Sequence, residues 1–244
     1  MSETTIATPN LTALEGILFD IGDTLLQISY DLEAGIRRLM ELVDQTKTIG
    51  YPEARRIGDE LGKSSEIVRL GANFEVSFEA FHRNIFDRFG WTSGLDWKKL
   101  DLEFFKASHS FKLEAGVIEA LDLLRARGIR MGAVSNSANT GSTLEWQCRT
   151  SGIMHYFDFL ISSADYGFRK PHPEIFETAI ARLGLPRERV WFIGDRPHLD
   201  ILGAKGVGLT AVWYNADGET ECTPEPDLTI TSWGEFAALM CSVG

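Results

Sequence analysis

Cysteine, positive charge and long apolar runs are all scarce in this sequence of 244 residues. Its three cysteines, Cys148, Cys222 and Cys241, lack the close paired spacing of a zinc site or of a disulfide framework. No uninterrupted apolar run approaches the ~18 residues that a membrane span requires. Residues 1–6 also lack the basic and apolar stretches of an export signal. We therefore expect a cytoplasmic protein with no membrane partner.

Acidic residues outnumber basic ones, with 35 Asp and Glu against 24 Lys and Arg, which gives a formal net charge of −11. A field of this sign repels polyanions, so we expect no nucleic-acid partner. The chain has no internal repeat and no low-complexity segment, and its 44% hydrophobic content is ordinary for a globular protein. Its length fits one large domain or a core with an insertion, and it leaves the oligomeric state open.

Short apolar runs alternate with amphipathic segments in the second half of the chain. After a first strand that ends before Asp20, we expect strands at 129–135, 157–162, 190–194, 209–213 and 228–230. We expect helices at 117–127, 140–150, 173–183, 199–205 and 233–240. Such alternation implies right-handed crossovers between parallel strands. The pattern therefore predicts an α/β protein with a doubly wound, Rossmann-like parallel sheet.

The stretch from Leu26 to Phe111 follows a different pattern, because apolar residues recur there at helical spacing. Leu32, Ile36 and Leu39 fall on one helix face, and further helices are expected at 52–70, 78–89 and 96–108. No strand-like run interrupts this stretch. We therefore predict a smaller helical domain at 27–112, inserted into a core made of 1–26 and 113–244.

Polar side chains follow the expected strands where each of them ends. Asp20 follows the first strand, Ser135 ends the next one, and Asp195 follows the strand at 190–194, with Asp200 close behind and Lys170 just before a helix. The carboxyl ends of parallel strands share one edge of a sheet, so these groups should converge there. Clustered carboxylates repel one another unless a cation neutralises them, and Mg²⁺ prefers such oxygen ligands. Asp20 is then a candidate nucleophile for phosphoryl transfer.

Four ordered motifs resemble those of the haloacid dehalogenase-like superfamily over about residues 16–240. They are Asp20-Ile21-Gly22-Asp23-Thr24, Ser135-Asn136, Lys170-Pro171, and Gly194-Asp195 with Asp200. The resemblance implies a Rossmann-like core and Mg²⁺-dependent hydrolysis of a small phosphorylated metabolite through an aspartyl phosphate. It also implies that the helical segment after the first motif is a cap, which covers the substrate and excludes water.

The resemblance also implies a role for each matching residue. Asp20 would be the nucleophile and a Mg²⁺ ligand, with Ser135 and Lys170 as catalytic groups that bind the phosphate. Thr24 and Asn136 would assist substrate binding. The remaining metal-site residues are Gly22 through its carbonyl, Asp195, and Asp200 through bound waters.

Gly22 departs from the family pattern, because most phosphatases of the family carry an acid/base Asp two residues after the nucleophile. Positioned acid–base catalysis contributes on the order of 10²–10⁴-fold, so turnover of poor leaving groups should be slow. Three interpretations stay open: Asp23 or a cap residue moves the proton, the substrate has a good leaving group, or the protein is a weakened binding module for a phospho-ligand or a protein. A 2-haloacid dehalogenase is a further alternative, but those enzymes use no Mg²⁺ and lack the Gly-Asp motif that this chain keeps.

Overall fold

A six-stranded parallel sheet forms the centre of the protein, which is described by a computed structural model for residues 11–45 and 48–242. The strand order is β10-β9-β8-β1-β6-β7. Their bounds are β1 Gly16–Phe19, β6 Arg130–Ser135, β7 Phe159–Ser162, β8 Val190–Gly194, β9 Thr210–Tyr214 and β10 Leu228–Ile230. Every residue of β1, β7 and β8 is buried, because helices cover both faces of the sheet. The predicted α/β fold class is confirmed.

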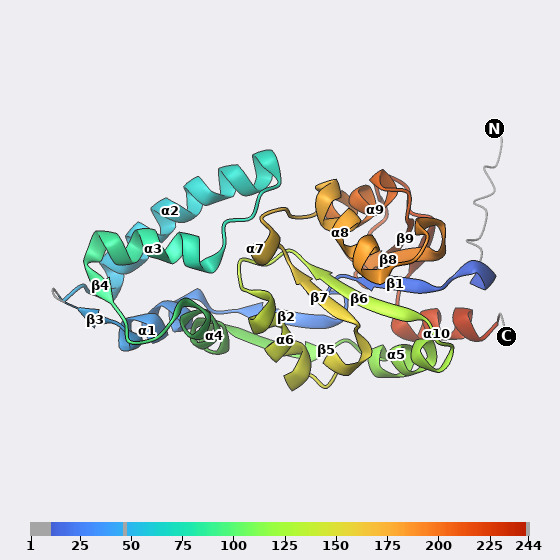
Figure 1. Ribbon diagram of the computed structural model, residues 1–244, viewed down its shortest axis with the longest axis horizontal. Helices are drawn as coiled ribbons and strands as arrows, with labels where there is room; N and C mark the ends of the chain where they lie inside the picture. Colours follow the sequence, from blue (N-terminus) through green and yellow to red (C-terminus); the bar gives the residue numbers. More distant parts are fainter. Residues whose placement is uncertain (1–10, 46–47, 243–244) are drawn as a thin grey trace.

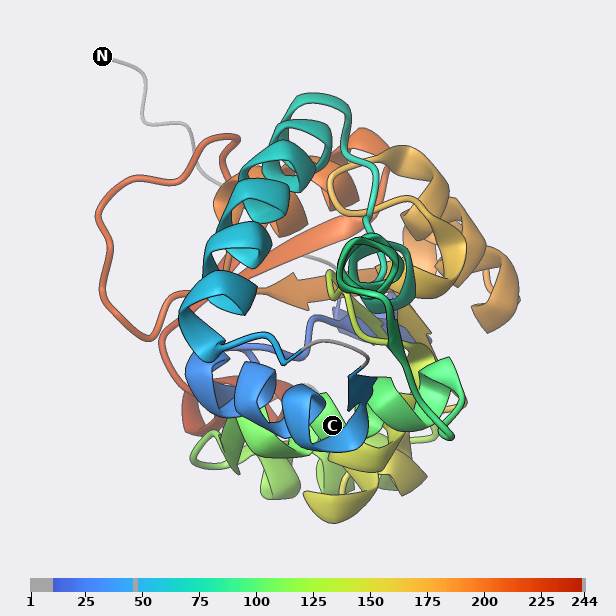
Figure 2. The ribbon, with the colours of Figure 1, turned by 90° about the vertical axis from the view of Figure 1, so that its left-hand side faces the viewer.

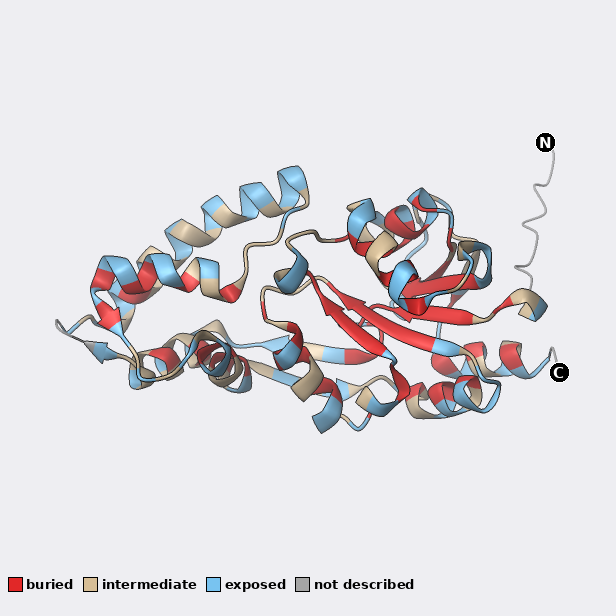
Figure 3. Cartoon of the chain, viewed as in Figure 1, coloured by how far each residue is buried: buried red, intermediate tan, exposed pale blue. Residues whose placement is uncertain are grey.

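Helices pack on both faces of this sheet (Figure 1). On one face lie α5 Val117–Ala126, α6 Gly141–Thr150 and α10 Trp233–Cys241, and on the other lie α8 Pro173–Leu183 and α9 Leu202–Gly206. Successive residues of β1 alternate between these layers, since Ile17 and Phe19 belong to the first hydrophobic cluster and Leu18 to the second. Figure 3 shows the buried strands between the two half-exposed helix layers. The packed helix layers therefore hold the residues at the carboxyl edge of the sheet in fixed positions.

Residues 32–108, here called the helical segment, lie beyond the carboxyl ends of the strands (Figures 1 and 2). The segment contains α1 Leu32–Leu42, α2 Tyr51–Ala72, α3 Phe78–Phe89 and α4 Trp97–Ser108. Asp31, Ser77 and Asp96 cap three of these helices by accepting a backbone N–H with their side chains. The four helices share a hydrophobic cluster of their own, which is separate from the two clusters of the sheet. The segment thus has its own packing.

The prediction that no strand interrupts the stretch from Leu26 to Phe111 is wrong. β2 Leu26–Tyr30 pairs antiparallel with β5 His109–Leu113, and β3 Asp44–Gln45 pairs with β4 Trp91–Thr92. The two longer strands form a ribbon that joins the helical segment to the sheet. The strands of this ribbon are only partly buried and alternate apolar with polar residues, so a search for continuous apolar runs misses them.

The expected core elements agree with the structure except at their ends. The largest difference is the helix expected at 199–205, which is a π-helical turn at Pro197–Ile201 followed by α9. The short helix α7 Ser163–Tyr166 and 3-10 turns at Leu11–Ala13, Met154–Tyr156 and Arg187–Arg189 were not expected. The expectations for residues 1–10 lie outside the described residues. In the described part of the chain, no helix has the length and apolar character needed to cross a bilayer.

Candidate active site

Three carboxylates meet at the carboxyl edge of the sheet. Asp20 follows β1 and Asp195 follows β8, and these two strands are adjacent and parallel. The N–H of Asp20 donates to the carbonyl of Ile193 at 2.9 Å, which fixes the chain just beyond β1. One oxygen each of Asp20, Asp195 and Asp200 lies within 4.8 Å of the others. The sequence prediction that these residues converge is in agreement with this geometry.

A tight turn between β8 and α9 brings Asp200 into the cluster. The N–H of Asp200 donates to the carbonyl of Arg196 at 2.7 Å, and the N–H of Arg196 donates to Asp200 Oδ2 at 2.9 Å. Gly194 makes this turn possible, because a Cβ at that position would overlap three side-chain atoms of Asp200. The glycine of the Gly194-Asp195 pair thus provides space for a carboxylate.

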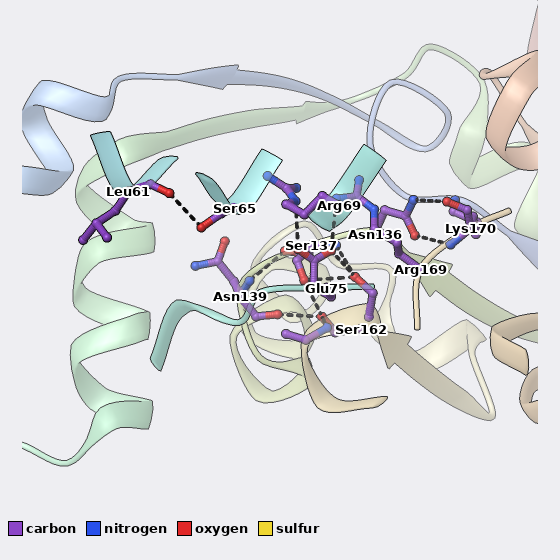
Figure 4. A network of polar contacts seen from close by, with 12 residues as sticks. Leu61, Ser65, Arg69, Glu75, Asn136, Ser137, Asn139, Ser162, Arg169 and Lys170 are labelled. Atoms are coloured by element: carbon purple, nitrogen blue, oxygen red, sulfur yellow. Dashed lines mark hydrogen bonds and ion pairs between the residues drawn. The ribbon is translucent and has the colours of Figure 1, made fainter. Parts of the chain in front are cut away.

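Lys170 is the cation within this cluster. Its side chain is 1% exposed, and its Nζ lies 2.5 Å from Asp20 Oδ1 and 2.7 Å from Asp200 Oδ1. Asn136 holds the backbone of Lys170 from the end of β6: its Oδ1 accepts the Lys170 N–H at 2.7 Å, and its Nδ2 donates to the Lys170 carbonyl at 2.9 Å (Figure 4). Asn136 therefore positions the lysine, while its predicted contact with a substrate stays a prediction.

Thr24 and two tryptophans hold the loops that carry the acids. The hydroxyl of Thr24, which is fully buried, donates to Asp195 Oδ1 at 3.2 Å. The indole N–H of Trp233 donates to the Thr24 carbonyl at 3.0 Å, and that of Trp213 donates to the Asp195 carbonyl at 2.9 Å. The structure thus gives Thr24 a contact with Asp195, and its predicted role in substrate binding stays a prediction. The role of Trp213 is visible only in the structure, since an indole hydrogen bond leaves no trace in the sequence.

Burial and mutual repulsion raise the pKa values of two of these acids, Asp20 and Asp195. Burial raises the pKa of Asp20 to about 6, with Lys170 opposing and Asp200 adding to the rise. Burial, Asp20 and Asp200 together raise the pKa of Asp195 to about 8. Burial lowers the pKa of Lys170, but its two carboxylate partners outweigh burial and raise it overall. One lysine does not balance three acids, so the donor set fits a hard divalent cation such as Mg²⁺.

A cavity of about 250 Å³, here called the Asp20 cavity, opens beside this cluster. Its lining includes six of the predicted site residues: Asp20, Gly22, Ser135, Asn136, Lys170 and Asp200. Asp195 lines a neighbouring cavity of about 660 Å³, and Asp23 and Arg196 line both. A cation among the three carboxylates would therefore lie between the two cavities.

Several residues of the Asp20 cavity were not expected from the sequence, and three of them are described here. Phe105 of α4, His109 at the start of β5 and Gln147 of α6 line the cavity beside the predicted residues. Burial lowers the pKa of His109 to about 4, and its ring stacks on Phe105 with centroids 4.0 Å apart. These side chains come from elements outside the four motifs, so only the tertiary structure reveals them.

Gly22 and Asp23 follow the nucleophile candidate without offering an obvious acid. Gly22 lines the Asp20 cavity, and a Cβ added there would meet one atom within 4 Å, Ile28 Cδ1 at 3.2 Å. Asp23 has φ of 56°, and its Oδ1 accepts the N–H of Ile28 at 3.4 Å. Its other oxygen lies 3.5 Å from Arg196. Asp23 thus has the contacts of a turn residue.

A buried ionic network joins the helical segment to the core next to Lys170 (Figure 4). Glu75, whose side chain is 0% exposed, lies 3.0 Å from Arg69 of α2 and 3.6 Å from Arg169. The hydroxyl of Ser163 donates to Glu75 Oε2 at 2.7 Å. The N–H of Arg169 also donates to the carbonyl of Asn73 at 3.0 Å. This set of contacts, here called the Glu75 network, fixes the end of α2 over the loop that carries Lys170.

Comparisons with known proteins agree with this arrangement. The profile of the family described as "Hydrolase: haloacid dehalogenase-like hydrolase" matches residues 14–208, so the chain belongs to this family of enzymes. The chain is 28% identical over 212 residues to glyceraldehyde 3-phosphate phosphatase of Methanothermobacter thermautotrophicus, which covers 84% of this chain and 87% of that protein.

Two solved structures share the whole fold. A HAD phosphatase from Thermococcus onnurineus has a TM-score of 0.63 and 26% identity, covering 93% of this chain and 98% of that one. A 2-haloacid dehalogenase from Pseudomonas syringae pv. Tomato has a TM-score of 0.64 and 20% identity, covering 95% and 100%, and it supports the fold alone. The predicted family and hydrolase class are confirmed.

Proposed function

We propose that this hydrolase is a Mg²⁺-dependent phosphatase that acts on a small phosphorylated metabolite through an aspartyl phosphate on Asp20. The observation that carries the proposal is the cluster of Asp20, Asp195 and Asp200 beside the Asp20 cavity, with Lys170 in contact with Asp20 and Asp200. A 2-haloacid dehalogenase has no use for a third acid and a cation site, because halide departs as an anion. The phosphatase names of a relative and of one structure that exceeds 25% identity point the same way.

Asp20 attacks phosphorus with a carboxylate oxygen, and the bond between phosphorus and the leaving oxygen breaks. Lys170 and the Ser135 hydroxyl bind the phosphoryl oxygens, and Lys170 keeps Asp20 in its ionised form by direct contact. Asp20, Asp195, the Gly22 carbonyl and, through water, Asp200 would hold Mg²⁺, which would neutralise charge on the phosphoryl group. Water then hydrolyses the aspartyl phosphate and regenerates the Asp20 carboxylate.

The helical segment serves as the cap in this proposal. It lies over the carboxyl edge of the sheet and supplies Phe105 to the Asp20 cavity, while the ribbon supplies Ile28 and His109. Apolar and neutral walls of this kind exclude water from the reacting groups. The division into a core of 1–26 and 113–244 and a cap of 27–112 stays part of the proposal.

Replacement of the nucleophile tests the reaction itself. We expect Asp20→Asn to release no phosphate, because an amide does not attack phosphorus, while the wild-type protein releases phosphate only with Mg²⁺ present. Phosphate release from aryl and acyl phosphates, with and without EDTA, measures this. Asp23→Asn is the matched control on the same loop and should keep most of the activity if Asp23 is a turn residue. Turnover by Asp20→Asn at the wild-type rate would discard the assignment.

Restoring the missing acid tests the consequence of Gly22. We expect Gly22→Asp to raise kcat for alkyl phosphates by roughly 10²-fold or more, because leaving-group protonation is gained. The new Cβ must displace only the flexible end of Ile28, so the variant should fold. Acetyl phosphate, whose leaving group needs little protonation, serves as the control substrate and should gain far less. An unchanged rate on alkyl phosphates would show that another group already moves the proton.

A further inference from the structure

A second cavity, of about 790 Å³, lies inside the helical segment and is here called the helical-segment cavity. Its lining comes from α1, α2, α3 and α4 and from residues 136–139 of the core. Buried apolar side chains form much of this wall: Leu39, Phe78, Ile85, Trp91 and Phe104. A cavity lined in this way favours an apolar occupant over water.

Four small residues of α2 leave this space open, beside four charged residues of the same helix that also line the cavity, Arg55, Asp59, Lys63 and Arg69. Ala54, Gly58, Gly62 and Ser65 follow one another at helical spacing and all line the cavity. A Cβ built on Gly58 or on Gly62 meets no atom within 4 Å, so neither glycine is required by close packing. Glycine is among the least favourable residues in a helix interior. Two glycines on this face therefore weaken the helix and enlarge the cavity.

The two cavities are adjacent at the boundary between ribbon and core. His109, Asn136 and Ser137 line both the Asp20 cavity and the helical-segment cavity. Burial keeps His109 neutral, with its pKa lowered to about 4, so the passage carries no fixed charge from this ring. A molecule with its phosphate at Asp20 would therefore have to reach past His109 to contact the apolar wall of the helical-segment cavity.

The sizes of the two cavities bear on the substrate. The Asp20 cavity, at about 250 Å³, holds a phosphoryl group with a few attached atoms. A three-carbon ester would leave the larger chamber without an occupant, and its apolar walls would gain nothing from binding. Burial of apolar surface strengthens binding by about fourfold for each methylene group. The helical-segment cavity therefore favours substrates with a large apolar group.

We propose that the preferred substrates are phosphate monoesters whose alcohol carries an extended apolar chain or an aromatic ring, which occupies the helical-segment cavity. This proposal rests on the proposed function, because it assumes that the phosphate binds at Asp20. It separates this enzyme from the relatives named as glyceraldehyde 3-phosphate phosphatases, whose substrate has three carbons.

The direct test compares two alkyl phosphates with similar leaving groups, ethyl phosphate and 4-phenylbutyl phosphate. Both need the same assistance from an acid, so Gly22 affects them equally. We expect kcat/KM to be roughly 100-fold higher for 4-phenylbutyl phosphate, from the added apolar burial. Equal values for the two esters would overturn the proposal.

Two matched glycine variants on α2 test whether the apolar part of the substrate lies in the helical-segment cavity. Gly58→Leu puts a side chain into the helical-segment cavity, whereas Gly71→Leu adds the same side chain on the same helix away from it. We expect Gly58→Leu to lower kcat/KM for 4-phenylbutyl phosphate by about tenfold or more and to leave ethyl phosphate unaffected. Gly71→Leu should change neither value. Equal effects of the two variants would overturn the placement.

Binding of phosphonates separates this proposal from the proposed function. 4-Phenylbutylphosphonate and ethylphosphonate do not release phosphate, so calorimetry in Mg²⁺ reports their affinity without catalysis. Tighter binding of the phenylbutyl compound, lost in Gly58→Leu, supports the chamber even if no ester is hydrolysed. Absence of hydrolysis for every ester would count against the phosphatase alone, while equal or absent phosphonate binding would overturn the substrate class.

Discussion

At the scale of single residues, the site depends on residues that provide space or hold the backbone as much as on the reactive side chains. Gly194 lets Asp200 lie beside Asp20 and Asp195, and Asn136 fixes the backbone of Lys170. These two positions were found in the sequence because they belong to recognisable motifs at the ends of strands. Phe105, His109 and Gln147 line the same cavity but were not found, because no local pattern marks a residue that the fold brings there from another element.

Gly194→Ala tests the need for space at the end of β8. We expect the added methyl group to displace Asp200 and to weaken Mg²⁺ binding roughly 10- to 100-fold, the usual effect of losing a supporting contact at a metal site. Calorimetric titration with Mg²⁺ measures the loss. Gly206→Ala is the control, since a Cβ there meets no atom within 4 Å. Full Mg²⁺ affinity in Gly194→Ala would mean that Asp200 does not support the metal.

At the scale of elements, a ribbon and a network connect the helical segment to the sheet. The strands and contacts of these connections were not predicted from the sequence, because β2 and β5 are half-exposed and alternate apolar with polar residues. The core elements were predictable, since each fully buried strand reads as a continuous apolar run. The helices of the segment were equally clear from the spacing of Leu32, Ile36 and Leu39.

Glu75→Gln tests the Glu75 network. The substitution leaves the Arg169 side chain, which is 11% exposed, without a carboxylate partner, so we expect the free energy of unfolding to fall by roughly 3 kcal/mol. Urea denaturation followed by circular dichroism measures this change. Glu79→Gln is the matched control, because its ion pair with Arg83 is exposed and should be worth under about 1 kcal/mol. Similar losses in both variants would show that the network adds no stability.

At the scale of the whole molecule, an acidic protein concentrates part of its charge in one buried cluster. The pKa values of Asp20 and Asp195 are about 6 and about 8, above the ordinary 3.8. The folded protein therefore holds protons that the unfolded chain has already released between about pH 4 and pH 8. Stability of the metal-free protein must then fall as pH rises through this range, since the unfolded state binds fewer protons.

Metal binding should show the opposite dependence on pH. Mg²⁺ needs ionised carboxylates, so we expect its affinity to rise about tenfold per pH unit between about pH 6 and pH 8 and to level off above that range. Calorimetric titrations across this range measure the affinity, and melting temperatures in EDTA measure the stability. Asp195→Asn should bind Mg²⁺ weakly at every pH. A pH-independent affinity in the wild-type protein would contradict the shifted pKa values.

The indole of Trp213 gives the acid cluster a built-in optical reporter. Its N–H donates a hydrogen bond to the Asp195 carbonyl, and the N–H of Trp233 donates one to the Thr24 carbonyl. Tryptophan emission responds to the polarity and charge around the ring. Occupancy of the site can therefore be followed by ultraviolet fluorescence in the unlabelled protein, and Trp213→Phe, which also loses the hydrogen bond to the Asp195 carbonyl, should lower the response.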